Sequence, residues 1–126
     1  MGQSNGTPSK DPLVNANYGV AYTNRIPRRS SSRFLQAIVT LNHYVAYSYE
    51  YNGGDARNQS DAIVSTYDFA GTCLPACEAS LMYGNAKGIM LSYQSLDSVP
   101  TCANKWLNRL LRDQVGERFI PSHASA

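Results

Sequence analysis

The fold prediction starts from the tyrosine-rich segment YVAYSYEYNGGDARNQSDAIVSTYDF, which runs from Tyr44 to Phe69. Tyrosine, valine and isoleucine favour strands, and the turn formers Asn52-Gly53-Gly54-Asp55 divide the segment into two halves. The segment therefore predicts a β-hairpin.

Strand patterns continue on both sides of this hairpin. Apolar and polar positions alternate over residues 34–51, which is typical of a strand with one buried face. The returning strand is expected over residues 61–69, and a third strand over residues 82–95. A helix is expected over residues 97–119, because six apolar residues recur there at helical spacing: Ala103, Trp106, Leu107, Leu110, Leu111 and Val115. The pattern predicts an α+β fold, an antiparallel β-sheet meander followed by a C-terminal helix.

The length of 126 residues predicts one domain. We expect a polar N-terminal arm over residues 1–16, the β-sheet over residues 17–96 and a helical C-terminal part over residues 97–122. Within the first part, residues 18–22 fit a short strand and residues 26–32 a loop. No run of about 18 apolar residues predicts a membrane span.

Basic residues are concentrated near the start of the chain, while the net charge of the whole chain is only +2. Four arginines lie in RIPRRSSSR with no acidic residue among them: Arg25, Arg28, Arg29 and Arg33. This cluster favours either a local contact with nucleic acid or an ordinary solvated loop.

The sequence offers little support for enzyme chemistry. It contains none of the G-x-S-x-G, P-loop, G-x-G-x-x-G or H-E-x-x-H motifs, and its carboxylates show no acid/base spacing. His43 lies on the apolar face of the expected strand, which favours a core histidine. Cys73 and Cys77 lack the second ligand pair of a zinc site, so a disulfide is favoured over a metal. We expect no catalytic activity, no cofactor and no metal.

The order of strand, hairpin, strand, cysteine-containing loop, strand and helix resembles the coat proteins of single-stranded RNA bacteriophages, the levivirus family of the MS2 and Qβ type. GTCLPACEAS (Gly71 to Ser80) is placed like the cysteine loop of that family, and Tyr83-Gly84-Asn85 is similar to its Tyr-x-Asn motif. The segment LSYQSLDSVPTCANKWLNRLLRD follows as that family's last strand and first helix do. A short second helix would begin near Phe119.

The resemblance implies an intertwined homodimer that assembles into an icosahedral shell around single-stranded RNA. The virion would then be the location of the protein, after assembly in the host bacterial cytoplasm. In that family each helix packs on the partner's sheet, a role that falls here to Trp106, Leu107, Leu110 and Leu111. Cys73 and Cys77 would link neighbouring subunits by disulfides.

The resemblance also implies that the polar face of the sheet binds RNA, including an operator hairpin. Tyr83 would stack on an unpaired base and Asn85 would hydrogen-bond nearby, although an ordinary strand start explains both residues equally well. The other candidate RNA contacts are Ser48, Thr66, Arg57, Lys87 and the cluster of Arg25, Arg28, Arg29 and Arg33.

Two other classes of function remain open at this stage. One is a small non-enzymatic binding or inhibitor protein that acts through its sheet and the arginine cluster. The other is a small enzyme, which the missing motifs disfavour. Particle size separates a coat protein from an inhibitor, because only a coat protein forms large particles.

Overall fold

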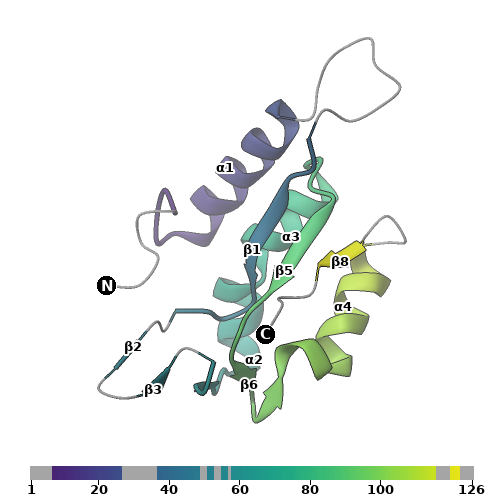
Figure 1. Ribbon diagram of the computed structural model, residues 1–126. Coiled ribbons are helices and arrows are strands. Elements are labelled where there is room, and N and C mark those ends of the chain that lie inside the picture. Colours follow the sequence, from purple (N-terminus) through teal and green to yellow (C-terminus); the bar gives the residue numbers. More distant parts are fainter. Residues whose placement is uncertain are drawn as a thin grey trace.

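The structure of the chain is a computed structural model that describes residues 7–26, 37–48, 51–52, 55–56, 58–115 and 120–122. Its centre is a three-stranded sheet in the order β1-β5-β8 (Thr40–Tyr44, Gly88–Leu91 and Ile120–Ser122). Both pairs of neighbouring strands are parallel. In Figure 1, β1 and β5 run side by side through the middle of the molecule, with α1 next to β1 and α4 next to β8.

The expected antiparallel meander is therefore wrong. β5 is a continuous apolar run, Gly-Ile-Met-Leu, with three of its four residues buried. Parallel strands have helices on both faces, so their sequences lose the alternation that marks a one-sided sheet. Alternation also carries no information about which strand is the neighbour or in which direction it runs.

The chain begins with helix α1 (Pro12–Arg25), where a strand was expected at residues 18–22. The side chain of Asp11 accepts hydrogen bonds from the backbone N–H groups of Leu13 and Val14, at 2.8 and 3.2 Å. Pro12 occupies the first turn, where its fixed φ fits and its missing N–H costs nothing. This start signal outweighs the strand propensity of the tyrosines, and the helix begins inside the expected polar arm.

The hairpin is present only as a two-residue ladder, β2 (Tyr51–Asn52) with β3 (Asp55–Ala56), on either side of the expected turn. The returning strand is reduced to β4 (Asp61–Ala62), which pairs with β6 (Ser95–Leu96); β6 also pairs with β7 (Val99–Pro100). The prediction of one long strand over residues 61–69 is wrong, because Ser65 starts a helical segment. Its hydroxyl accepts a hydrogen bond from the N–H of Asp68 at 3.1 Å.

The expected cysteine loop is helical. Helix α2 (Thr66–Asp68) leads into the π-helical turn η2 (Phe69–Cys73) and then into α3 (Pro75–Met82). Pro75 stands in the first turn of α3, where proline fits the start of a helix. Residues 82–87 end this helix and lead to β5, which is why the expected third strand is shorter than predicted.

The C-terminal helix exists but is shorter than expected: α4 spans Lys105–Val115. The 3₁₀ turn η3 (Thr101–Ala103) precedes it. Asn104 starts the helix, because its side-chain oxygen accepts hydrogen bonds from the N–H groups of Trp106 and Leu107, both at 3.1 Å. The second short helix expected near Phe119 is wrong, since β8 occupies residues 120–122.

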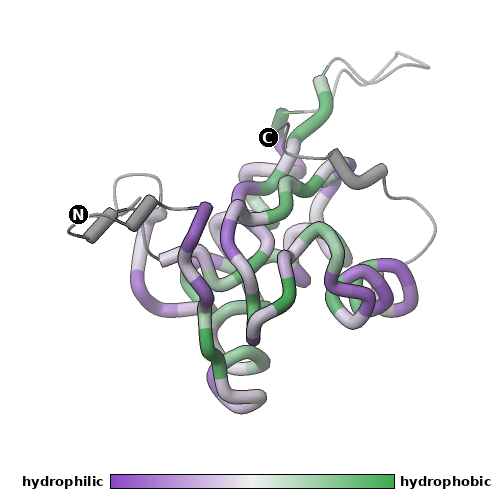
Figure 2. The backbone as a smooth tube through the Cα atoms, turned by 60° about the horizontal axis from the view of Figure 1, so that its bottom comes forward, coloured by the Kyte–Doolittle hydropathy of each residue, from purple (hydrophilic) through white to green (hydrophobic). Residues whose placement is uncertain are grey.

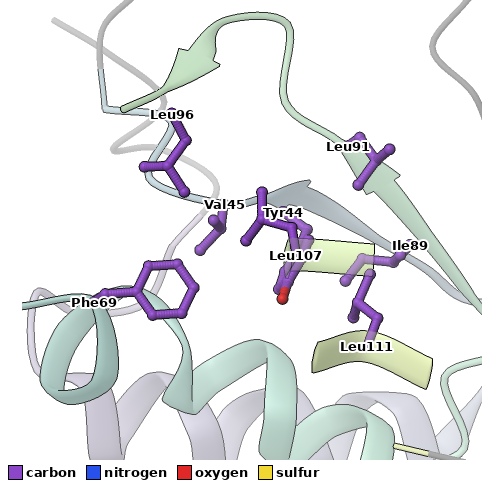
Figure 3. Packing of buried hydrophobic residues seen from close by; sticks show 8 residues of the cluster. All are labelled: Tyr44, Val45, Phe69, Ile89, Leu91, Leu96, Leu107 and Leu111. Carbon is purple, nitrogen blue, oxygen red and sulfur yellow. The ribbon is translucent and has the colours of Figure 1, made fainter. Parts of the chain in front are cut away.

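The hydrophobic core lies between the sheet and the helices. Its members are Tyr44, Val45, Phe69, Ile89, Leu91, Leu96, Leu107 and Leu111. Figure 3 shows side chains from β1, β5, η2 and α4 converging on one another. Leu107 is completely buried, so α4 is fixed to its own sheet by burial of its apolar face.

Hydrophobic and hydrophilic stretches alternate along the chain in Figure 2. In the part of the chain that the structure describes, no helix has the length and apolar character needed to cross a membrane.

Candidate functional site

Three ring side chains gather where the two central parallel strands end. His43 lies on β1, Tyr47 follows β1, and Tyr93 follows β5. Because β1 and β5 are parallel neighbours, the residues at their carboxyl ends meet at one edge of the sheet. Ligand sites of parallel α/β sheets lie at this edge. We call the three residues the ring cluster.

The rings of this cluster contact one another pairwise. The ring centroids of His43 and Tyr47 are 4.6 Å apart, those of His43 and Tyr93 are 5.6 Å apart, and those of Tyr47 and Tyr93 are 6.0 Å apart. The planes are tilted by 47°, 50° and 61°, which are favourable angles for aromatic pairs. All three side chains are only partly buried. The cluster is thus a rigid surface that keeps access to solvent.

A break in the strand register sets the position of His43. Asn42 is opposite Met90 and Tyr44 is opposite Leu91, so the register shifts by one residue at His43. Such a bulge redirects a side chain at the end of a strand. Ala46, shortly after, has a positive φ of 58°, which bends the chain and leads it to Tyr47.

A buried network of hydrogen bonds holds the segments that carry the cluster. The N–H of Ser92 donates to the carbonyl of Tyr44 at 2.7 Å, and the hydroxyl of Ser92 accepts from the N–H of Val45 at 3.1 Å. The side-chain amide of Gln94 donates to the carbonyl of Ala46 at 2.9 Å. Thr101 donates its hydroxyl proton to the carbonyl of Ser92. Buried bonds of this kind fix geometry, because breaking one leaves a polar group without water.

Three polar side-chain atoms of this region are buried away from solvent. They are the side-chain oxygen of Gln94 and the hydroxyls of Tyr44 and Tyr47. Burial, followed by the neighbouring Cys77 and Glu78, raises the pKa of the Tyr44 phenol, which keeps it protonated. Tyr44 belongs to the hydrophobic core, and Gln94 belongs to the hydrogen-bond network that holds the segment before Tyr47.

The thiols lie elsewhere, against the helical side of the core. Burial, and then the nearby Cys73, raises the pKa of Cys77 to about 11. Burial and then Asp68 raise the pKa of Cys73 in the same direction. These thiols are neutral and therefore weak nucleophiles and weak metal ligands near neutral pH. Within the described ranges, no group of three or more His, Cys, Asp or Glu side chains could hold a metal ion.

Two of the predicted RNA contacts lie together, away from the ring cluster. Tyr83 follows α3 and is 71% exposed. Its carbonyl accepts from the side-chain amide of Asn24 at 3.1 Å, and Asn85 donates to the side-chain oxygen of Asn24 at 2.6 Å. The two residues therefore join α3 to the end of α1, where Arg25 is exposed.

The other predicted RNA contacts are scattered. Ser48 is exposed beyond β1, Thr66 is exposed at the start of α2, and Lys87 is half-buried before β5. Arg28, Arg29, Arg33 and Arg57 lie outside the described residues.

The residues expected to pack a dimer lie on α4. Leu107 and Leu111 are buried in the core of their own chain, Leu110 is half-buried beside it, and the ring of Trp106 lies 4.9 Å from that of Phe69 while remaining 52% exposed. Cys73 and Cys77 are free thiols, as is Cys102. A disulfide between subunits stays a prediction.

Sequence reasoning missed the ring cluster. Tyr93 was not singled out, Tyr47 was assigned to packing, and His43 was assigned to the core. A partial signal was present, because SYQS directly follows the apolar run of residues 88–91, and HYVAY follows the mostly apolar segment of residues 37–42. Reading those runs as parallel strands would have placed the three rings at one edge.

Comparison with curated proteins shows clear relatives. The chain is 32% identical over 133 residues to a probable β-D-xylosidase of Arabidopsis thaliana, covering 99% of this chain and 17% of that protein. It is 31% identical over 116 residues to a probable exo-1,4-β-xylosidase of Aspergillus flavus, covering 91% of this chain and 15% of that protein. The chain thus spans about one sixth of the length of these relatives. No family model matches it.

Solved structures agree with these relatives. A GH3 exo-β-xylosidase bound to a xylobiose aziridine probe matches 98% of the chain and 16% of its own length, with a TM-score of 0.89 and 25% identity. A β-glucosidase of Listeria innocua bound to glucose matches 94% of the chain and 16% of its own length, with a TM-score of 0.73 and 26% identity.

These findings overturn the coat-protein interpretation. The resemblance to RNA-phage coats is wrong, and so are the capsid function, the RNA and self-assembly partners, the virion location and the expectation of a non-enzymatic chain. The comparisons do not support the inhibitor alternative either. The coat-fold prediction is wrong because a short apolar run does not show the direction of its strand. Parallel strands can therefore give the same order of elements along the sequence as the antiparallel coat fold. The relatives of the chain are β-xylosidases and β-glucosidases of glycoside hydrolase family 3, and its fold matches a segment of those enzymes.

Proposed function

We propose that the chain contributes a sugar-binding surface to a glycosidase of the β-xylosidase and β-glucosidase type, with the ring cluster of His43, Tyr47 and Tyr93 as its contact surface. The observation that carries this proposal is the packing of three rings, 4.6–6.0 Å apart, at the carboxyl ends of two adjacent parallel strands.

The chemistry of the cluster suits a pyranose. A sugar ring presents C–H groups on its faces and hydroxyls around its rim. Aromatic rings offer an apolar body for the faces, while the Tyr93 hydroxyl and the imidazole nitrogens of His43 offer polar groups for the rim. The Tyr47 hydroxyl is buried, so Tyr47 contributes its ring face. Sites of this kind combine mostly apolar contacts with a few placed polar groups.

Hydrolysis requires more than this surface. Glycosidases generally use two carboxyl groups on either side of the scissile bond. Several described carboxylates already serve the fold: Asp11 caps α1, Asp61 accepts from Ser98, and Asp97 accepts from the N–H of Val64. The proposal for this chain is therefore limited to sugar binding, and we assign the two carboxyl groups to no described residue.

The proposal is tested by saturation-transfer NMR with methyl β-D-xylopyranoside and the chain. We expect binding in the millimolar range, as is usual for a ligand of this size. Tyr93→Ala removes one ring of the cluster and should abolish the transfer. Tyr67→Ala is the matched control, because Tyr67 is 86% exposed on α2 and belongs to no part of the cluster.

Thermal unfolding of both variants separates loss of binding from loss of folding. Binding that is unchanged in a folded Tyr93→Ala variant would refute the proposal. Equal loss in the Tyr67→Ala variant would also refute it, since the sugar would then contact exposed tyrosines without selection.

A further inference from the structure

The chain bends sharply just before Tyr47, one of the three residues of the ring cluster. Ala46 has a φ of 58°, in the left-handed region that residues other than glycine rarely occupy. The N–H of Ser48 then donates to the carbonyl of Ala46 at 3.2 Å, which closes a γ-turn with Tyr47 at its centre. The position of the Tyr47 ring therefore depends on the direction of the Ala46 carbonyl.

The side chain of Gln94 holds this bend. Its amide donates to the carbonyl of Ala46 at 2.9 Å and to that of Val45 at 3.3 Å. The carbonyl of Ala46 thus accepts two hydrogen bonds, one from the turn and one from Gln94, and together they fix its direction. Gln94 is 3% exposed, so these bonds lie away from bulk water, where they are strongest.

The main chain of Gln94 is itself held in place beside Tyr93. The N–H of Thr101 donates to the carbonyl of Gln94 at 3.3 Å, and the hydroxyl of Thr101 donates to the carbonyl of Ser92. These two bonds hold the chain on both sides of Tyr93. Gln94 therefore extends from the segment that carries the Tyr93 ring to the bend that carries the Tyr47 ring, and it connects the two.

A purely stabilising role does not explain this side chain. The oxygen of the Gln94 amide is buried and has no hydrogen-bond partner among the described residues, an arrangement that costs free energy. The two carbonyls that it contacts have other donors. That of Ala46 accepts from Ser48, and that of Val45 accepts from the hydroxyl of Ser92 at 3.0 Å. An apolar side chain of the same length would therefore leave neither carbonyl unpaired, but it would no longer fix the bend.

We propose that Gln94 is a positioning residue of the ring cluster, which holds the Tyr47 ring against those of His43 and Tyr93 and thereby shapes the contact surface for a sugar. This inference rests on the proposed function, because it assigns a role within the same site. A binding surface loses affinity when its parts must be ordered at the moment of binding, even where the fold is intact.

Gln94→Met tests this role, because methionine keeps the length of the side chain and removes the amide. The melting temperature should change by less than about 4 °C. In saturation-transfer titrations of the chain with methyl β-D-xylopyranoside, the Kd should rise about tenfold. Ser80→Ala is the matched control, because it also removes a buried side-chain donor, the hydroxyl that donates to the carbonyl of Ala76 at 2.8 Å, but on α3 and outside the ring cluster. Its Kd should equal that of the unchanged chain.

Proton NMR of His43 measures the ring geometry without any ligand. The chain has two histidines, so a His123→Gln variant assigns the imidazole signals of His43. The Tyr47 ring lies 4.6 Å from that of His43, close enough for its ring current to shift these signals. Gln94→Met should move them toward the values of a histidine without an aromatic neighbour, and Ser80→Ala should leave them unchanged.

The outcomes separate this inference from the proposed function. Unchanged Kd and unchanged His43 signals in Gln94→Met would overturn the positioning role. A Gln94→Met variant that does not fold, or whose melting temperature falls by more than about 4 °C, would overturn it too, since Gln94 would then act on the stability of the whole fold. If the unchanged chain binds no xyloside, the proposed function fails, and the His43 signals alone decide whether Gln94 holds the rings.

Discussion

The position of α4 in the core allows a quantitative prediction for Leu107→Ala. Leu107 lies on α4, and its side chain is fully buried. Tyr44 of β1, Ile89 of β5 and Leu111 of α4 belong to the same core cluster (Figure 3). Truncation removes its burial and leaves a cavity that the surrounding strands cannot fill completely. We expect a loss of about 3 kcal/mol in the free energy of unfolding.

Urea denaturation followed by circular dichroism measures this loss. At constant m-value the midpoint should fall, and the melting temperature should fall by roughly 10 °C for a domain of this size. Arg109→Ala is the matched control on the same helix, because Arg109 is exposed and its replacement should change stability by less than about 0.5 kcal/mol. Leu110→Ala, at a half-buried position, should lie between the two and provides a measurement if Leu107→Ala does not fold.

The result also separates two accounts of α4. If α4 packs on its own sheet, the loss is independent of protein concentration. If it packed on a second copy, as the coat-protein interpretation required, the stability of the unchanged chain would rise with concentration. A loss below about 1 kcal/mol in Leu107→Ala would refute the core described above.

Three further predictions follow from the helices. Asp11→Ala removes both side-chain bonds that start α1 and should lower stability by about 1 kcal/mol in urea denaturation, whereas Asp11→Asn, which keeps an acceptor, should restore most of it. Gly84→Ala places a Cβ against the carbonyl of Ser80 and the hydroxyl of Thr23, and should lower the free energy of unfolding by about 1–3 kcal/mol. An unchanged melting temperature would contradict the close approach of α1 and α3 at Gly84. The pKa of Cys77 is raised from the ordinary thiol value of 9.0 to about 11, so the folded state holds its proton more tightly. Its contribution to stability is complete below pH 9 and is lost as the pH rises through 11, and Cys77→Ala should flatten the alkaline fall in melting temperature.

Some of the fold was accessible from the sequence. Three of the predicted apolar positions of α4 contact the core: Leu107, Leu110 and Leu111. Their i, i+3 and i+4 spacing indicates one face of a helix. Trp106 is 52% exposed, and Ala103 lies in η3 before the helix. The turn at residues 52–55 is flanked by paired residues, as Asn-Gly-Gly-Asp predicts. In both places a local rule decides the structure without reference to the rest of the chain.

The errors arose where two local rules compete. Residues 18–22 have high strand propensity, but Asp11 and Pro12 start a helix before them, and the helix continues through the tyrosines. The loop expected over residues 71–80 followed from the resemblance, whereas Pro75 fits the first turn of a helix and α3 begins there. Short apolar runs such as residues 88–91 fit a parallel or an antiparallel strand, so strand order could not be decided from sequence.

The ring cluster was beyond prediction for a different reason. His43 and Tyr93 are 50 positions apart in the chain, and only the parallel pairing of β1 with β5 brings their rings to 5.6 Å. The bulge at His43 has no sequence signal of its own. A site that depends on strand order and on one shifted register therefore appears only with the structure.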